Sequence, residues 1–482
     1  RFSLALGCPT KLFYTRKKDF TDKKNNASFL LALAEGGFQV GELAKHYHPG
    51  GYNIDSLNVD DAIEETNQLL AKDKVIIYEA AFRFNHCFIR VDVLVKDGNN
   101  IELIEVKAKS FKSIDKFYNA SGFIATGWLP YLYDVAFQLW VMQNACPDFI
   151  ITPYLMLADK NKKTSIDGLN QFFKIEKNEE GRKKIKVDKN IDINQLGEKI
   201  LTKIDVGDFM QMIYNGKDKK ESGEGFINKI EAYEDYYKKD LMYPISLGLH
   251  CKKCEFKDDL DVSKSGYFKC WNHIFPEFTI DEPHVFDIWN YRKSQAVIDS
   301  NLYKMKDVYS SEFVNTLNDR QYLQVDKRVN QSIDEDIKPE LFNEIQKWEF
   351  PLHFIDFETC MIAIPFHKNR TPYEQIAFQF SCHTLYEDGK IEHHEWIEKD
   401  ANNFPNYEFV KALKKILGND NGNIFRYSPH ENTVLLQIRS QMIADDELKY
   451  KELIDWIDTI TYRKDIDNPK KIIEGPRNMI DL

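Results

Sequence analysis

The sequence lacks the features that mark several classes of protein. No apolar run approaches the roughly 18 residues that cross a bilayer, and no charged segment followed by an apolar one resembles a secretory leader. Its 65 Lys and Arg do not outnumber its 76 Asp and Glu, and the formal net charge is -11. That balance excludes nucleic-acid binding through a basic field of the whole molecule and leaves local patches. We expect a cytoplasmic protein without a membrane segment, trimmed at its start because it begins with Arg1.

Cysteine is also scarce. Eight cysteines among 482 residues do not resemble a disulfide framework, and a clustered subset in a reducing compartment indicates a metal site. Apolar residues, by contrast, are abundant. They make up 43% of the sequence, which is typical of a folded protein. The length is sufficient for two or three domains, each with its own core.

The pattern of residues 88–107 predicts a β-hairpin. Its two arms, residues 88–95 and 101–107, are rich in β-branched and aliphatic side chains and flank a Lys-Asp-Gly-Asn-Asn turn. A two- or four-residue loop at this turn makes Lys96 face Ile101. This pair fixes the register of both arms.

The register sets Asp92 directly opposite Glu105, with Lys107 on the same face. Opposed carboxylates repel each other, and burial on apolar arms makes unpaired acids costly. A divalent cation such as Mg²⁺ suits the two acids, and Lys107 suits an attacking water or a developing phosphate charge. The alternative is a surface salt bridge in which Lys107 neutralises one acid.

Apolar periodicity predicts helices over residues 27–47 and 130–144. Asp134 and Gln138 lie one turn apart on one face of the second helix, where a buried polar pair usually has a function. A capped core helix would show the same pattern. Glu42, on the first helix, is open to either a solvent-exposed or a metal-binding interpretation.

A second chemical cluster follows at residues 250–273. Cys251-x2-Cys254-x15-Cys270-x2-His273 is by itself a complete four-ligand zinc pattern. Alternatively, the three cysteines join Cys8 as the four thiolates of an iron–sulfur cluster. Spacing alone favours zinc.

Residues 193–245 and 285–345 are predicted to be helical. The last section begins with an apolar strand on which Asp356 and Glu358, two residues apart, project to the same side. Two strands, a helix, a strand and a helix that opens at Glu431 complete the order βββαβα. This is the order of a ribonuclease-H-like fold, in which acids of the first strand and of the element after the fourth meet around two metal ions.

With these residues in hand, the first part resembles the RecB-type branch of the PD-(D/E)XK nuclease superfamily, especially members that carry an iron–sulfur cluster. In that family an Asp on one strand precedes Glu-x-Lys on the next, and a later helix supplies a Gln with a Tyr or Asp about one turn earlier. The matching residues are Asp92, Glu105-Val106-Lys107, Tyr133, Asp134 and Gln138.

The resemblance implies that Asp92, Glu105 and the Val106 carbonyl hold Mg²⁺ or Mn²⁺, while Gln138 and Tyr133 position the substrate strand or the lysine. Glu42 stands where the family often has a metal-binding His, so we expect it to be the substitute ligand. The family also has a Cys-Pro near its start and three cysteines near its end. This match favours a [4Fe-4S] cluster over Zn²⁺, with ligands Cys8, Cys251, Cys254 and Cys270.

The C-terminal part is similar to a bacterial domain of unknown function that occurs behind such nucleases and resembles DEDD-type 3'-5' exonucleases. Asp356 and Glu358 match the first acidic motif, and Glu431 stands where the second motif expects Asp. The fourth acid is expected in a helix beyond the last residue. The resemblance thus implies a domain that is incomplete at its C-terminus.

The predicted fold class is α/β, in three parts. Residues 1–280 form a restriction-endonuclease-like PD-(D/E)XK domain with the cysteine cluster, residues 281–345 a helical connector, and residues 346–482 a ribonuclease-H-like domain. The implied function is metal-dependent hydrolysis of DNA, as an exonuclease of repair or defence that acts on a free or single-stranded end, with a helicase or defence complex as partner. Two alternatives stay open: a nucleic-acid-binding adaptor with an inactive C-terminal nuclease fold, and a nuclease directed at RNA.

Overall fold

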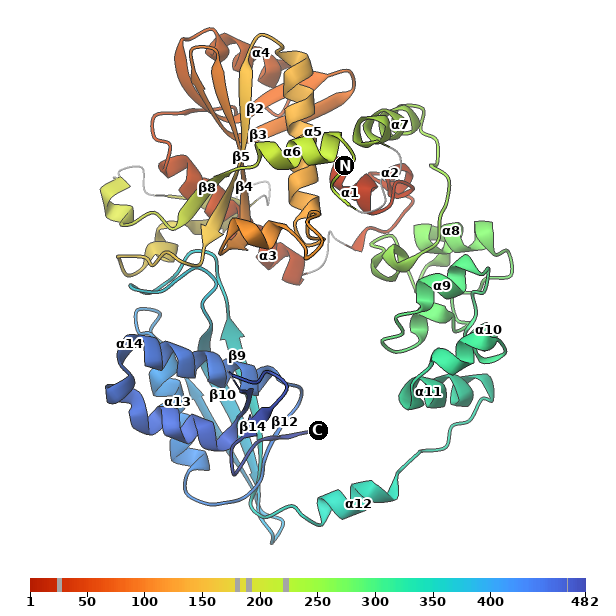
Figure 1. The fold of residues 1–482 in the computed structure, drawn as a ribbon, viewed down its shortest axis with the longest axis vertical. Coiled ribbons are helices and arrows are strands. Elements are labelled where there is room, and N and C mark those ends of the chain that lie inside the picture. The colour runs from red at the N-terminus through yellow and green to blue at the C-terminus, as the bar shows by residue number, and fades with distance from the viewer. Residues whose placement is uncertain (24–27, 178–182, 188–192, 220–224, 466) are drawn as a thin grey trace.

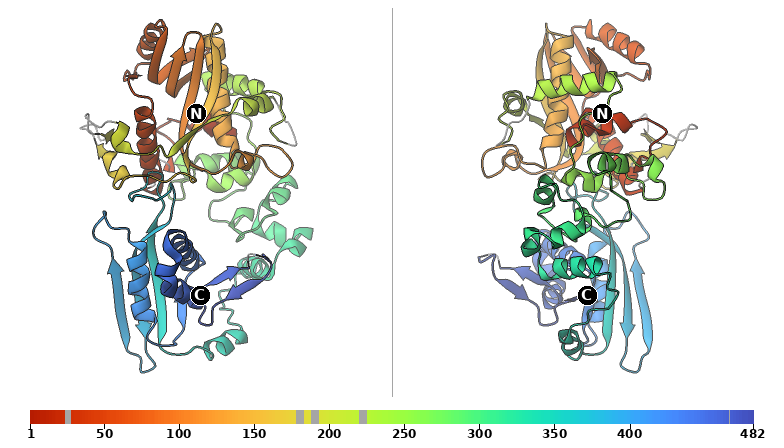
Figure 2. Two further views of the ribbon diagram at one scale, coloured as in Figure 1. Left: turned by 60° about the vertical axis from the view of Figure 1, so that its left-hand side comes forward. Right: turned by 90° about the vertical axis from the view of Figure 1, so that its right-hand side faces the viewer.

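The computed structural model describes residues 1–23, 28–177, 183–187, 193–219, 225–465 and 467–482. Two mixed or mainly antiparallel sheets form its two ends (Figure 1). A helical segment connects them along one side, and a loop from the second sheet reaches the first on the other side (Figures 1 and 2). The chain is therefore a mixed α/β protein, as its sequence predicts.

The first sheet has six strands in the order β1-β2-β3-β4-β5-β8. Strands β2, β3 and β4 form an antiparallel meander, α5 then crosses over, and β5 returns parallel to β4. Such a crossover is what a parallel pair requires. The bounds are β1 Tyr52–Asn53, β2 Lys74–Phe84, β3 Cys87–Asp97, β4 Asn100–Phe111, α5 Leu129–Ala145, β5 Ile150–Asp159 and β8 Leu201–Asp205.

The predicted register of the hairpin is confirmed. Lys96 pairs with Ile101, and the ladder continues to Val93 opposite Ile104, so the next position along brings Asp92 to Glu105. Gly98 adopts a φ of 60° in the turn, a conformation that glycine reaches without the steric cost of a side chain. Turn chemistry visible in the sequence thus fixes which charged groups meet.

Helices cover both faces of the first sheet, which explains why its strands are apolar on both sides. Leu94 and Leu103 face a core shared with α5, whereas Val93 and Ile104 face a core shared with α3. The helices that flank the sheet or follow it are α1 Phe2–Gly7, α2 Lys11–Tyr14, α3 Ser28–His46, α4 Val59–Leu70, α6 Gly207–Tyr214 and α7 Phe226–Lys238. The helix predicted over residues 27–47 is confirmed within one residue at each end.

The prediction that residues 193–245 are helical is wrong in part. Residues 201–205 form β8, which pairs antiparallel with β5 at the edge of the first sheet. Leu201 is buried while Thr202 and Asp205 are not, so a short alternating strand was hidden between helical patterns. The lysine-rich segment that precedes β8 in the chain contains the small hairpin β6 Lys174–Lys177 and β7 Lys183–Lys186.

One apolar cluster extends from Leu247 to Val325, centred on the fully buried Trp271. The domain boundary expected at residue 280 falls inside this cluster, because the cysteine segment and the connector share their buried side chains. The helices are α8 Gly266–Ile274, α9 Ser294–Asp299, α10 Met305–Tyr309 and α11 Asp319–Val329, and α12 Pro339–Ile345 leads on to the second sheet (Figure 1).

The second sheet has the order β11-β10-β9-β12-β15. Strands β9, β10 and β11 are antiparallel neighbours, whereas β12 runs parallel to β9 and β15 parallel to β12. The bounds are β9 Leu352–Cys360, β10 Ile376–Leu385, β11 Ile391–Ile397, α13 Asn406–Leu417, β12 Ile424–Arg426, α14 His430–Ile460, β13 Tyr462–Lys464, β14 Ile472–Glu474 and β15 Ile480–Asp481. The predicted order βββαβα is confirmed for β9 to α14.

Alternation along β9 separates its two faces. Ile355 and Phe357 are buried in a core with α13 and α14, while Asp356 and Glu358, which alternate with them, are exposed. The two acids therefore project from the face that these helices do not cover. No helix among the described residues combines the length and the apolar character needed to cross a membrane.

Candidate active site

Charged and amide side chains of β4 and α5 form a connected network beside the hairpin. The Lys107 Nζ donates to Glu105 Oε1 at 2.5 Å and to Asp134 Oδ2 at 2.7 Å. Gln138 Nε2 donates to the other oxygen of Glu105, Oε2, at 2.7 Å. Both oxygens of Glu105 are thereby held, and the carboxylate has a fixed orientation.

Asp92 enters the cluster from β3. Its Oδ2 accepts the backbone N–H of Val106 at 2.7 Å, so the residue predicted to offer a carbonyl to a metal also anchors Asp92. Beyond Val93 the cross-strand ladder ends, and this side-chain bond links the two arms instead. Asp92 is thus bonded to Val106, the residue that directly follows Glu105 on β4.

The pKa values show how unfavourable this arrangement is for negative charge. Burial raises the pKa of Asp92 to about 6, against the opposing effects of Lys107 and the Val106 N–H. Burial and the Asp92 charge raise the pKa of Glu105 well above its usual range. Burial acts to lower the pKa of Lys107, but the charges of Glu105 and Asp134 outweigh it and raise that pKa. The lysine remains an ammonium.

Three carboxylates and one ammonium leave an excess of negative charge when all are ionised. Either protons or a cation must compensate it, since buried uncompensated charge is costly. Gln138 is 5% exposed and its Oε1 has no hydrogen-bond partner among the described residues. An orphaned buried oxygen on the amide that bonds Glu105 is a fitting acceptor for a cation's water shell, so the donor set suits Mg²⁺ or Mn²⁺.

Lys107 bridges two of the acids as the side chains stand. Within the described ranges, no three His, Cys, Asp or Glu side chains, those of the hairpin and the four cysteines included, form a group that could hold a metal ion as they stand. The fit to a cation therefore rests on the chemistry of the donors and on the unpaired Gln138 oxygen.

Two further predicted residues lie outside this network. Glu42, on α3, pairs with Lys45 at 3.4 Å, and no contact with Asp92 or Glu105 is recorded for it among the described residues. The Tyr133 hydroxyl donates to Asp218, and its ring stacks on Phe226. Of the two neighbours on α5, Asp134 rather than Tyr133 reaches Lys107.

Glu79 was missed by sequence reasoning. It lies on β2 between Tyr78, which pairs with Val93, and Ala80, which pairs with Val91, so it is placed beside Asp92. Its charge contributes to the raised pKa of Asp92, and its φ of 58° is rare for a residue with a side chain. The available signal was its isolation, since it is the only charged residue in the apolar stretch 75–82.

The structure brings the four predicted cysteines Cys8, Cys251, Cys254 and Cys270 together around one cavity. Cys8 directly follows α1 and Cys270 lies in α8, so the cavity joins the two ends of a long stretch of chain. His273 is not one of the described residues that line it, although it shares α8 with Cys270.

Polar groups around the cavity suit anionic sulfur. The Tyr14 hydroxyl lies 3.2 Å from Cys270 Sγ, and Lys11 and His250 also line the cavity. Trp271, fully buried on the cavity wall, has an Nε1–H without a partner among the described residues. Burial raises the pKa of Cys254 to about 11 and of Cys270 to about 12, so these two thiols are neutral without a bound metal. A thiolate-bound metal or cluster would give the Trp271 N–H an acceptor.

The acids of the second domain form a looser group. Glu431, 3% exposed at the start of α14, has a partnerless Oε2. Burial raises the pKa of Glu431, and the nearby charge of Asp356 adds to this effect. Asp481, on β15, pairs with Arg426 at 2.9 Å and accepts the Ser428 N–H. Asp356 and Glu431 are thus neighbours, whereas the Glu358 side chain makes no hydrogen bond or ion pair with the described residues.

Comparison with known proteins identifies one part of the chain. Residues 353–473, from β9 into β14, match the model of a family described as a domain of unknown function, DUF2779. No curated protein and no solved structure matches the chain.

Proposed function

We propose that this protein is a metal-dependent nuclease that hydrolyses phosphodiester bonds of DNA with its catalytic centre in the β3–β4 hairpin. The observation that carries the proposal is the cluster of Asp92, Glu105 and Lys107, in which Glu105 is buried and Gln138 holds its carboxylate. Acids with raised pKa values beside a lysine are typical of functional sites.

The topology around the cluster supports the same conclusion. An antiparallel meander β2–β3–β4, a crossover helix and a parallel β5 correspond to the core of PD-(D/E)XK nucleases, which the sequence resembles. Asp92 lies on the second strand of this meander and Glu105-Val106-Lys107 on the third. This arrangement supports the assignment of these residues to one nuclease site.

Each residue then has a defined task. Asp92, Glu105 and the Val106 carbonyl would hold Mg²⁺ or Mn²⁺, and such an ion, when bound, lowers the pKa of a coordinated water. Gln138 fixes the orientation of Glu105, and Asp134 keeps Lys107 charged and directed toward Glu105. The Lys107 ammonium is placed to stabilise negative charge that develops on a phosphate.

The cysteine cavity serves structure in this proposal. Because the thiols lie at both ends of residues 8–270, a [4Fe-4S] cluster there would hold the first domain closed. The zinc alternative uses His273, which does not line the cavity, so we favour the four-cysteine set.

Replacing Cys8 by Ser should remove iron, sulfide and the broad visible absorbance of the anaerobically purified protein. Unchanged absorbance, or one bound zinc ion that His273→Asn removes, would contradict the cluster.

The strand order of the second domain supports a nuclease-like fold, but its acidic residues give weaker support for nuclease activity. Three antiparallel strands followed by two that run parallel to the first, in the order β11-β10-β9-β12-β15, correspond to the ribonuclease-H-like arrangement. Its acids Asp356 and Glu358 are exposed and only Glu431 is buried. We assign this domain a role in binding the substrate strand or supporting the first domain.

The test is cleavage of end-labelled single- and double-stranded DNA, with RNA of the same sequence, in Mg²⁺ or Mn²⁺. Lys107→Ala should abolish cleavage, whereas Lys74→Ala should not, because Lys74 is an exposed lysine that pairs only with Asp97 on the same sheet. Cleavage of RNA alone would correct the substrate. No cleavage of any strand would refute the enzyme and favour a binding adaptor.

A further inference from the structure

The loop between β9 and β10, residues 361–375, belongs to the second domain but packs into the first. We call it the bridging loop. Ala363 and Ile364 are buried in the same cluster as Val93, Ile104 and Val106, the apolar neighbours of the hairpin acids. The hydrophobic core behind the candidate active site is therefore completed by the second domain.

Main-chain hydrogen bonds fix the bridging loop against the segment that follows β5. The Gly168 N–H donates to the Phe366 carbonyl at 2.6 Å, and the Thr164 N–H donates to the Arg370 carbonyl at 3.0 Å. In return, the Asn369 N–H donates to the Thr164 carbonyl at 2.8 Å. Reciprocal bonds of this kind define one relative position of the loop and the first domain.

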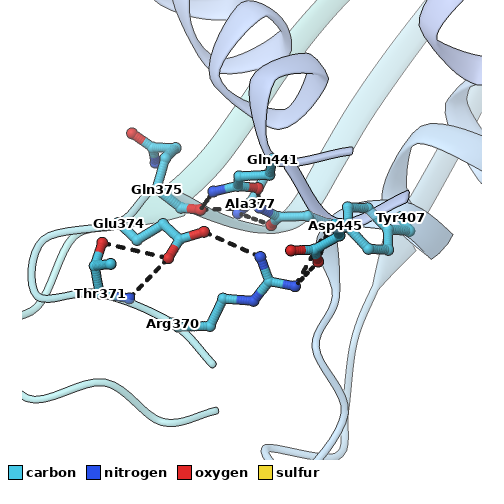
Figure 3. Close-up of polar contacts among 9 residues, drawn as sticks. Arg370, Thr371, Glu374, Gln375, Ala377, Tyr407, Gln441 and Asp445 are labelled. Atoms are coloured by element: carbon cyan, nitrogen blue, oxygen red, sulfur yellow. Dashed lines mark hydrogen bonds and ion pairs between the residues drawn. The ribbon is translucent and has the colours of Figure 1, made fainter. Parts of the chain in front are cut away.

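The base of the loop is equally well held within its own domain (Figure 3). The Arg370 guanidinium contacts Glu374 at 3.1 Å and also Asp445 of α14, and it lies 3.8 Å from the centre of the Phe404 ring. Gln441 donates to the Gln375 carbonyl at 2.9 Å, as does a neighbouring Asn of α13. The loop is thus a rigid extension of the second domain.

Tyr373 connects this extension to the strand that carries the catalytic lysine. The pairing of β4 with β5 shifts register between Lys107 and Ser110, so the Ala108 carbonyl lies at a β-bulge. The Tyr373 hydroxyl donates to that carbonyl. Tyr373 itself has a φ of 58°, a conformation that its surroundings must enforce.

We propose that Tyr373 is a positioning residue for the hairpin site, so that the domain of unknown function completes the site of the first domain. By fixing the bulge one residue after Lys107, Tyr373 sets where the Lys107 ammonium meets Glu105 and Asp134. The catalytic consequence rests on the proposed nuclease function, whereas the mechanical coupling does not.

The experiment compares the full chain with Tyr373→Phe, which keeps the ring and removes the hydroxyl. Tyr386→Phe is the matched control, because the Tyr386 hydroxyl bonds Glu392 at 2.9 Å within the second domain. Hydrogen exchange over residues 105–111, Mn²⁺ affinity and single-turnover cleavage are measured on each. Loss of one hydrogen bond is expected to speed exchange there and weaken Mn²⁺ binding by about two- to tenfold.

The readouts separate this inference from the proposed function. Faster exchange confined to residues 105–111 in Tyr373→Phe, absent in Tyr386→Phe, supports the coupling even if the chain cleaves no nucleic acid. Unchanged exchange and unchanged Mn²⁺ affinity overturn it, even if the unmodified chain is an active nuclease. Equal acceleration across the first sheet also overturns it, since the tyrosine would then be only a stability contact.

Discussion

The two acidic clusters of this protein differ in what surrounds their carboxylates. In the hairpin, Glu105 is 5% exposed and both its oxygens are bonded, with Lys107 within contact distance. In the second domain, Asp356 and Glu358 are exposed on β9, and Arg426 is paired with Asp481 rather than with them. Pre-organised, desolvated charge favours catalysis, so the comparison supports our proposal that the chemistry belongs to the hairpin.

The largest expected difference is between Glu105→Gln and Glu358→Gln. Glu105→Gln keeps the shape of the side chain and removes the charge that would hold the metal, so single-turnover cleavage should fall by about 10³-fold. Stability in urea should be unchanged or higher above neutral pH, since one repelling buried charge is gone. Glu358→Gln should leave cleavage and stability nearly unchanged. Similar losses of cleavage in both variants would contradict the assignment of the chemistry to the hairpin.

Removal of the lysine tests the hairpin's charge balance. Lys107→Met leaves Glu105 and Asp134 without their ammonium, and we expect a loss of about 3 kcal/mol in the free energy of unfolding. Asp481→Asn breaks a pair in the second domain in which Asp481 is half-exposed and the buried Arg426 keeps the Ser428 carbonyl as an acceptor, so it should cost about 1 kcal/mol or less. Denaturant titration of both variants without metal gives the two values. A loss in Lys107→Met no larger than that in Asp481→Asn would show that the hairpin acids already share protons.

The raised pKa of Asp92 predicts a pH-dependent response to metal. Its folded pKa of about 6 exceeds the ordinary aspartate value of 3.8, so the native state binds more protons between pH 3.8 and about 6, and the contribution of Asp92 to stability falls as pH rises through that window. A bound cation would stabilise the ionised carboxylate of Asp92 and offset the cost of its burial. Mn²⁺ should therefore raise the melting temperature more at about pH 8 than at about pH 5. Asp92→Asn should reduce this pH dependence and leave the part that Glu105 contributes, and a response independent of pH in the unmodified chain would contradict the assignment.

The smallest expected effect concerns Glu79. Because its charge contributes to the raised pKa of Asp92, Glu79→Gln should shift the midpoint of the Mn²⁺ response to lower pH by a fraction of a unit. Asp97→Asn, an exposed acid farther along β3, is the control. A shift to higher pH would mean that Glu79 serves the metal rather than opposing Asp92.

Local chemistry made much of this site predictable. The Gly98 turn fixes the hairpin register, and this register alone predicts that Asp92 lies beside Glu105. Helical spacing put Asp134 and Gln138 on one face, and both contact the hairpin residues. These inferences succeed because periodicity and turn type operate within about twenty residues of chain.

Features that depend on distant chain segments were not predictable. The role of Glu79 follows from its backbone φ and its neighbour on another strand. Strand β8 forms by pairing with the edge of β5, whereas its own five residues carry only a weak strand pattern. The bond from Tyr373 to Ala108 joins residues 265 apart in the sequence, which no local pattern records.

The most direct test of the central claim is cleavage of end-labelled single-stranded DNA by the anaerobically purified chain and by Lys107→Ala and Asp356→Ala, side by side in Mn²⁺. The account predicts that Lys107→Ala is inactive while Asp356→Ala retains cleavage. Loss of cleavage only in Asp356→Ala would place the chemistry in the second domain and contradict the account.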